Sequence, residues 1–118
     1  MQGELTNILI VDDEPANLLV LETVLEDPGY RLVRAQSADQ ALRALMADEF
    51  AVMVLDIQLP DMNGIELARA VRERYPGIKI ILASGYPQPA INGESMGEFS
   101  FVGKPYRLAD LARQLRSA

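Results

Sequence analysis

The sequence predicts an α/β fold in which helices cover both faces of a five-stranded parallel sheet. Short, continuous apolar runs alternate with segments of helical periodicity, and the loops between them are only a few residues long. Strands that are buried on both faces read as continuous apolar runs, and this alternation is typical of doubly wound sheets. A chain of 118 residues has the size of one domain, so we expect residues 1–118 to form a single unit.

Five segments are candidates for strands. They are, in chain order, residues 8–11, 32–33, 51–55, 78–83 and 101–102. The first, third and fourth are well-defined apolar runs, whereas the other two are short. Five strands and five helices in a chain of this length suit the flavodoxin-like strand order 2-1-3-4-5, which brings the carboxyl ends of the first and third strands together. A ligand site is expected where those two ends meet.

The first helix is predicted between Asp13 and about Asp27, because acids and a proline stand at its start and Pro28-Gly29 at its end. Its stripe toward the sheet is expected to consist of five residues: Asn17, Val20, Leu21, Val24 and Leu25. Leu19 then lies on the opposite side of the helix and Leu18 at the edge of the stripe.

The later helices differ in how clearly the sequence marks them. The second is expected to begin at Ser37, and the third to follow Asn63-Gly64 and end near Tyr75. Apolar residues at helical spacing over 108–115 predict the last one. The fourth falls on residues 86–98, which contain two prolines and two glycines, so we expect it to be short or irregular.

The composition excludes several classes of function. The chain has no Cys and no His, which removes disulfides, thiolate metal sites and the commonest general base. A net charge of −6 argues against direct nucleic-acid binding by this chain. No apolar run approaches a membrane span, and the N-terminus lacks the pattern of a secretory signal. We therefore expect a cytoplasmic domain whose chemistry uses carboxylates, hydroxyls, Lys and a hard metal ion.

Polar residues follow the predicted strands at one edge of the sheet. Asp12 and Asp13 come after the first strand, Asp56 ends the third, Ser84 follows the fourth and Lys104 follows the fifth. Carboxylates at adjacent strand ends repel each other unless a cation lies between them, and oxygen ligands favour Mg²⁺. Each residue also has a simpler interpretation: Asp13 as a helix N-cap, Ser84 as part of a turn and Lys104 as a solvated loop charge.

At these positions the sequence resembles the receiver domains of two-component response regulators, the CheY-like family, over essentially its whole length. The motifs that carry the resemblance are Val11-Asp12-Asp13-Glu14-Pro15, residues 55–64 (Leu-Asp-Ile-Gln-Leu-Pro-Asp-Met-Asn-Gly), Ala83-Ser84-Gly85-Tyr86 and Gly103-Lys104-Pro105-Tyr106. With its weak fourth helix, the chain is similar to receivers that form single-domain proteins or are attached to hybrid kinases.

The resemblance implies that Asp56 is the phosphoacceptor. It would receive phosphate from the phosphohistidine of a sensor histidine kinase or of a histidine phosphotransfer domain. The resemblance further implies that Asp13, Asp56 and the main-chain carbonyl of Gln58 bind Mg²⁺ directly, while Asp12 acts largely through water. Such a domain is regulatory, and it catalyses its own phosphorylation and dephosphorylation rather than the turnover of an external substrate.

The remaining roles also follow from the resemblance. Ser84 and Lys104 would contact the phosphoryl group, and Ser84 and Phe101 would form the switch that responds to it. Receivers typically dock a kinase beside the first helix, which makes Leu18 and Leu19 candidates for that interface. The output partner and the oligomeric state are left open, with a homodimer among the options.

Three alternatives remain at this stage. The first is a degenerate receiver that binds partners without phosphorylation. The second is an aspartyl-phosphate phosphatase of the haloacid dehalogenase type, which requires a second Asp where this chain has Gln58. The third is a flavin-binding module, whose phosphate Asp12-Asp13-Glu14 would repel.

Overall fold

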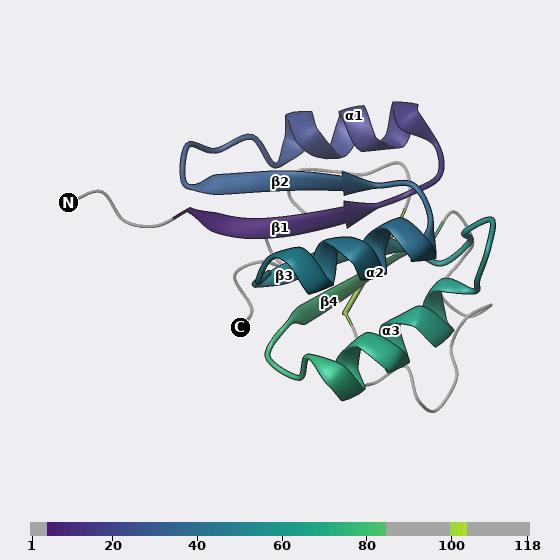
Figure 1. Cartoon of the computed structure of the whole chain (residues 1–118). Coiled ribbons are helices and arrows are strands. Elements are labelled where there is room, and N and C mark those ends of the chain that lie inside the picture. The colour runs from purple at the N-terminus through teal and green to yellow at the C-terminus, as the bar shows by residue number, and fades with distance from the viewer. Residues whose placement is uncertain (1–4, 85–99, 104–118) are drawn as a thin grey trace.

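One parallel sheet with helices on both faces forms the body of the molecule in the computed structural model (Figure 1). The structure describes residues 5–84 and 100–103. Its elements are β1 (Thr6–Val11), α1 (Pro15–Val24), β2 (Tyr30–Ala35), α2 (Ala38–Ala47), β3 (Val52–Asp56), α3 (Gly64–Arg74), β4 (Lys79–Ser84) and β5 (Ser100–Gly103). Strands and helices alternate from β1 to β4, as predicted.

The strands pair in the order β2-β1-β3-β4-β5, and all pairs are parallel. The predicted flavodoxin-like, doubly wound class is therefore confirmed, together with the order of the first four strands. The short β5 lies beside β4, with Leu82 opposite Phe101 and Ser84 opposite Gly103. The expected fourth and fifth helices fall outside the described residues, so the complete (βα)5 arrangement stays a prediction.

The core has two layers, because α1 covers one face of the sheet and α2 and α3 cover the other (Figure 1). Successive residues of β1 alternate between these layers. Leu9 packs in the cluster under α2 and α3, whereas Ile8 and Ile10 pack in the cluster under α1. Each fully buried Leu or Ile contributes about 2 kcal/mol. The central strands β1 and β3 thus fix the positions of the loops that follow them.

Helices α2 and α3 begin where the sequence predicts, each with a side-chain cap. The Ser37 hydroxyl accepts a hydrogen bond from the Gln40 N–H at 3.1 Å, and the Asn63 side chain accepts one from the Ile65 N–H at 2.7 Å. Helix α1 differs, because its N-cap is Glu14 and makes no side-chain capping bond. The interpretation of Asp13 as the N-cap is therefore wrong.

The orientation of α1 about its axis also differs from the prediction. Leu18 is completely buried, whereas Val20 is 40% and Leu19 59% exposed. The helix packs on the sheet through Leu18, Leu21 and Leu25, which are spaced at i, i+3 and i+7. The proposal of Leu18 as a kinase-docking residue is wrong, because its side chain fills the core. Leu19 is exposed, as that proposal requires.

Several predictions fall on parts of the chain for which the structure gives no side-chain placement. Lys104 lies outside the described residues. Ser84 and Phe101 are placed by their backbones in β4 and β5, but their side chains are outside the description. The contacts predicted for these three side chains stay predictions. Among the residues that the structure describes, no helix is both long and apolar enough to cross a membrane.

Candidate functional site

The carboxyl ends of β1 and β3 lie side by side. Val11, the last residue of β1, is opposite Leu55 in the register of the two strands. Asp12 follows directly, and Asp56 is the last residue of β3. The parallel pairing therefore places these two residues at the same edge of the sheet. Figure 1 shows the loop that leads from the end of β1 into α1.

Three carboxylates meet at this edge. Asp12, Asp13 and Asp56 each offer an oxygen atom, and these atoms all lie within 4.8 Å of one another. Asp12 is completely buried and Asp56 is 4% exposed, whereas Asp13 faces solvent. Like charges this close repel one another, and burial of two of them strengthens the repulsion. An all-oxygen set with this charge fits a hard divalent cation, which would relieve the repulsion.

The buried carboxylate of Asp12 is held in place by the start of α1. Its Oδ1 accepts a hydrogen bond from the Glu14 N–H at 3.0 Å and one from the Asn17 side-chain amide at 3.4 Å. The Asp12 N–H donates to the Ala35 carbonyl at 3.0 Å, which ties the same residue to β2. Asn17 was predicted only as part of the stripe toward the sheet. Its contact with Asp12 makes it a supporting residue of the acidic cluster.

The carboxylate of Asp56 is oriented by the loop that follows it. Its Oδ1 accepts a hydrogen bond from the Gln58 N–H at 3.3 Å. The N–H of Ile57, which lies between these two residues, donates to the Ala83 carbonyl of β4 at 3.0 Å. Gln58 is exposed and is the second residue of the loop that follows Asp56. This position is compatible with the metal-binding role predicted for its carbonyl group.

The loop between β3 and α3 closes on itself at its base. Gln58 forms an antiparallel bridge with Asn63, and the Gly64 N–H donates to the Ile57 carbonyl at 2.6 Å. A Cβ atom on Gly64 would clash with the Asp56 carbonyl oxygen and lie 2.7 Å from the Cα of Ile57. Only glycine fits this close approach of α3 to the end of β3. The sequence marked Asn63-Gly64 as a helix start but gave no sign of this contact.

The tip of the same loop is attached to α2. The carboxylate of Asp61 accepts hydrogen bonds from the N–H groups of Ala38, at 2.9 Å, and Asp39, at 3.1 Å. The bond from Ala38 is the main reason that the pKa of Asp61 lies below its ordinary value of 3.8. Sequence reasoning assigned no role to Asp61, because its partners are 22 and 23 residues away.

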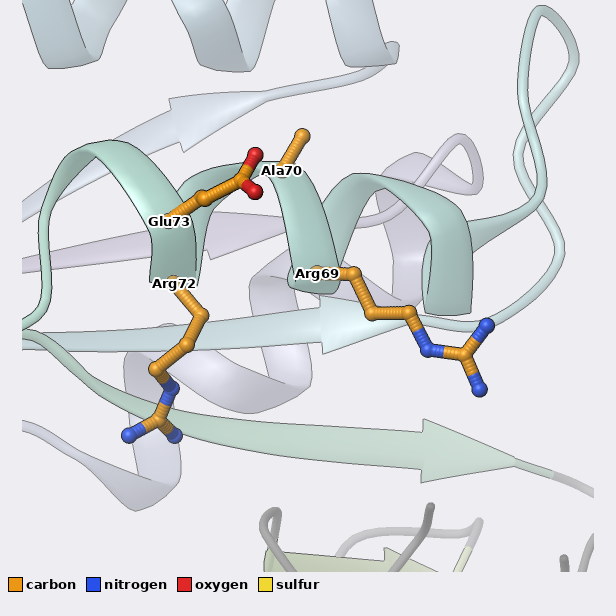
Figure 2. A pocket seen from close by; sticks show the side chains of 4 residues that line it. All are labelled: Arg69, Ala70, Arg72 and Glu73. Atoms are coloured by element: carbon orange, nitrogen blue, oxygen red, sulfur yellow. The ribbon is translucent and has the colours of Figure 1, made fainter.

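A surface cavity of about 420 Å³ lies elsewhere, along α3 (Figure 2). It is lined by Arg69, Ala70, Arg72 and Glu73. Figure 2 shows the two guanidinium groups extending from one side of α3, away from the Glu73 carboxylate. None of the predicted site residues lines this cavity, so the acidic edge of the sheet remains the candidate functional site.

The fold and this edge define a doubly wound α/β domain with a buried acidic cluster at the carboxyl ends of its central strands. The family model of the response regulator receiver domain matches residues 8–116. The chain therefore belongs to the receiver domains of two-component systems, the CheY-like regulatory domains. The resemblance seen in the sequence motifs is confirmed.

Known proteins of this family resemble the chain over nearly its full length. The receiver protein CpdR of Brucella abortus is 31% identical, and the alignment covers 92% of each chain. A solved CheY-like receiver domain from Methanospirillum hungatei JF-1 is 32% identical with a TM-score of 0.82, over 96% of this chain and 92% of that one. The response regulator TrrA of Thermotoga maritima, solved in complex with Mg²⁺-BeF, is 27% identical with a TM-score of 0.83, over 95% and 97% of the two chains.

Other curated relatives are longer than this chain. The Mycobacterium tuberculosis protein TcrX, whose name describes a transcriptional regulator, is 29% identical over 98% of this chain, which spans 50% of its length. The chain spans no more than a quarter of two further regulators.

Proposed function

We propose that this domain is a phosphoacceptor switch. Asp56 receives a phosphoryl group from the phosphohistidine of a sensor histidine kinase or of a histidine phosphotransfer domain, and phosphorylation changes which partners the domain binds. The observation that carries the proposal is the convergence of Asp12, Asp13 and Asp56 at the carboxyl ends of β1 and β3. Of the three, Asp56 is the one that ends a strand, at an almost buried position next to the exposed loop of Gln58.

The acidic cluster is the proposed Mg²⁺ site. Asp13, Asp56 and the Gln58 carbonyl would hold the ion directly, and Asp12 largely through water. When bound, Mg²⁺ neutralises negative charge on the phosphoryl oxygens and lowers the repulsion between the carboxylates and the incoming group. The Mg²⁺-BeF complex of the similar protein TrrA supports this assignment.

The residues of the chain supply the remaining chemistry. An oxygen of Asp56 forms the new bond to phosphorus, while the P–N bond of the donor breaks and its electron pair returns to the imidazole. The hydrogen bond from the Gln58 N–H orients the attacking carboxylate. Ser84 and Lys104 are proposed to bind the phosphoryl oxygens, and Ser84 and Phe101 to pass the change on to the partner surface.

The kinase-facing surface is proposed to include Leu19 and Val20 on the exposed side of α1. Both side chains face solvent next to the loop that carries Asp13. The net charge of −6 favours protein partners over direct contact with nucleic acid. We propose that the domain meets its kinase in the cytoplasm, and that its output passes through a protein partner.

The decisive experiment is intact-mass analysis after incubation with Mg²⁺ and acetyl phosphate. Wild type should gain one phosphoryl group, and Asp56→Asn should gain none. Labelling of Asp56→Asn to the wild-type level would show that the acceptor lies elsewhere. If neither acetyl phosphate nor a panel of phosphorylated kinases labels the wild type, the domain is a degenerate receiver and the proposal fails.

A second arm of the same assay tests the docking surface. Leu19→Asp should slow transfer from a phosphorylated kinase by about tenfold, since it places a charge in an apolar interface, while leaving labelling by acetyl phosphate unchanged. Glu26→Gln, at an exposed position in the loop after α1, is the control and should change neither rate. Equal slowing of both reactions by Leu19→Asp would contradict docking at this surface.

A further inference from the structure

The side chain of Asp61 hydrogen-bonds the loop between β3 and α3 to the first turn of α2. We propose that Asp61 is a positioning residue for the phosphorylation site. Its carboxylate holds this loop, and with it the main chain of Gln58, in the geometry that binds Mg²⁺. The inference rests on the proposed function, because it deepens the role of the same site. Asp61 lies outside the acidic cluster, and its carboxylate accepts hydrogen bonds from α2.

Hydrogen bonds hold the loop in two places, and Leu59 packs against the core under α2 and α3. At its base, the Gln58–Asn63 bridge and the bond from the Gly64 N–H to the Ile57 carbonyl hold its two ends together. At its tip, Asp61 reaches the first turn of α2. A loop closed only at its base can still tilt as a unit about that base. Fixing the tip removes this freedom, which is why the Asp61 bonds bear on where Gln58 lies.

The anchor on α2 is itself rigid. Ala38 and Ala41 of this helix are buried against the sheet, as is Leu45 one turn further on. The two N–H groups that bind Asp61 therefore have fixed positions relative to β1 and β3. The partial positive charge at the N-terminus of α2 strengthens the attachment to a carboxylate.

Capping of α2 alone does not account for the arrangement. The helix already has a local cap, since the Ser37 hydroxyl accepts the Gln40 N–H at 3.1 Å. The Gln40 side chain in turn accepts the Gln36 N–H at 2.8 Å. Asp61 adds bonds from another loop, 22 and 23 residues away. Ser37 and Asp61 thus stabilise the same helix end, but only Asp61 joins it to the loop beside the acidic cluster.

This difference provides a matched pair of variants. Asp61→Ala and Ser37→Ala should both lower the melting temperature by a few degrees, because each removes a side-chain cap from α2. Calorimetric titration with Mg²⁺ separates them. Asp61→Ala should weaken Mg²⁺ binding by about tenfold, the effect typical of losing an outer support of a metal site, and Ser37→Ala by less than about twofold. Asp61→Asn, which keeps one acceptor oxygen, should fall between wild type and Asp61→Ala.

A second readout follows from the reciprocity of coupled equilibria. If the Asp61 attachment strengthens Mg²⁺ binding, Mg²⁺ must strengthen the attachment by the same factor. Amide exchange at Ala38 and Asp39, followed by NMR, should therefore slow by up to about tenfold when Mg²⁺ binds wild type. It should not change in Asp61→Ala.

The outcomes separate this inference from the proposed function. Equal Mg²⁺ affinities of Asp61→Ala and Ser37→Ala would overturn the positioning role and leave Asp61 as a cap only. If Asp61→Ala does not fold, the same comparison between Asp61→Asn and Ser37→Ala decides the question. Failure of wild type to bind Mg²⁺, or binding that Asp56→Asn and Asp13→Asn leave unchanged, would instead overturn the proposed function itself.

Discussion

The two loops at the acidic edge use their polar side chains in opposite ways. The loop between β1 and α1 has three residues, 12–14, and the loop between β3 and α3 has seven, 57–63. The short loop contributes Asp12 and Asp13 to the acidic cluster, and Glu14 leaves α1 without a side-chain cap. In the long loop, Asn63 caps α3 and Asp61 binds α2.

The acidic edge holds a site that is unfavourable for folding. Three converging carboxylates oppose the folded state when no cation is present. The short loop tolerates them because it is tied to strands whose side chains are fully buried, such as Ile10 and Val11. The tip of the long loop, residues 60–62, is exposed, and hydrogen bonds to two helix ends hold the loop in addition to the packing of Ile57 and Leu59 against the core. Asp12 and Asp13 of the short loop thus form the candidate site, whereas Asp61 of the long loop holds the fold together.

The largest effect is expected where α3 meets the end of β3. Gly64→Ala should destabilise the fold by about 2–3 kcal/mol, because the new methyl group would overlap main-chain atoms that cannot move independently. The displaced end of β3 carries Asp56, so phosphorylation by acetyl phosphate should also fall. Urea denaturation and the intact-mass assay measure the two effects.

The control for this substitution is Gly77→Ala, where a Cβ atom would meet nothing within 4 Å. Its stability should stay within about 0.5 kcal/mol of wild type. If Gly64→Ala behaved like Gly77→Ala, the close approach of α3 to β3 would not constrain the site. The long loop would then be no more rigid than the short one.

The next effect tests the short loop. Asp13→Asn should stabilise the metal-free protein by about 1 kcal/mol, a figure reduced for the exposure of Asp13, because it removes one of three repelling charges. It should also weaken Mg²⁺ binding, so the rise in melting temperature on adding Mg²⁺ should shrink relative to wild type. Thermal denaturation with and without Mg²⁺ measures both.

Glu14→Gln is the matched control, because Glu14 is the adjacent acid and is not part of the acidic cluster. It should leave the stability and the Mg²⁺ response close to those of wild type. A loss of stability in metal-free Asp13→Asn would mean that Asp13 supports the fold, and the contrast between the two loops would disappear.

Much of this arrangement can be predicted from the sequence, because it depends on local patterns. Continuous apolar runs predicted the central strands, and Ser37 and Asn63 marked two helix starts that the structure confirms. The meeting of Asp12 and Asp56 followed from strand order alone. Parallel topology brings strand ends together whatever the side chains in between, which is why this part of the site was predictable.

The features that the sequence did not predict depend on the rotation of α1 about its axis and on contacts between segments that are far apart in the sequence. Apolar residues 18–21 surround more than half of α1, so periodicity cannot decide which of them faces the sheet. The prediction placed Val20 in the stripe and Leu18 only at its edge, whereas Val20 is 40% exposed and Leu18 is fully buried. The contacts of Asp61 and Gly64 join segments through the folded backbone. No spacing in the sequence encodes them, although both residues stand in a motif that was recognised.

The smallest effect concerns the pH dependence of stability and distinguishes the Asp61 carboxylate from those of the cluster. Hydrogen bonds from Ala38 and Asp39 hold the pKa of Asp61 below 3.8 in the folded state. A lowered folded pKa means that the carboxylate adds stability above the unfolded value and loses it as the pH falls through the folded pKa. The stability difference between wild type and Asp61→Asn should therefore be constant near neutral pH.

The stability difference between the two proteins should then narrow as the pH is lowered below 3.8. Protonation of Asp61 in wild type removes the negative charge, which is the property that the asparagine side chain of the variant lacks. Urea denaturation of the two proteins at several pH values, without Mg²⁺, measures it, and the other carboxylates cancel because both proteins share them. An Asp61→Asn difference that widens in acid would show that the Asp61 carboxylate is repelled rather than stabilised in the fold. Asp61 would then belong with the acidic cluster and not with the residues that hold the loop.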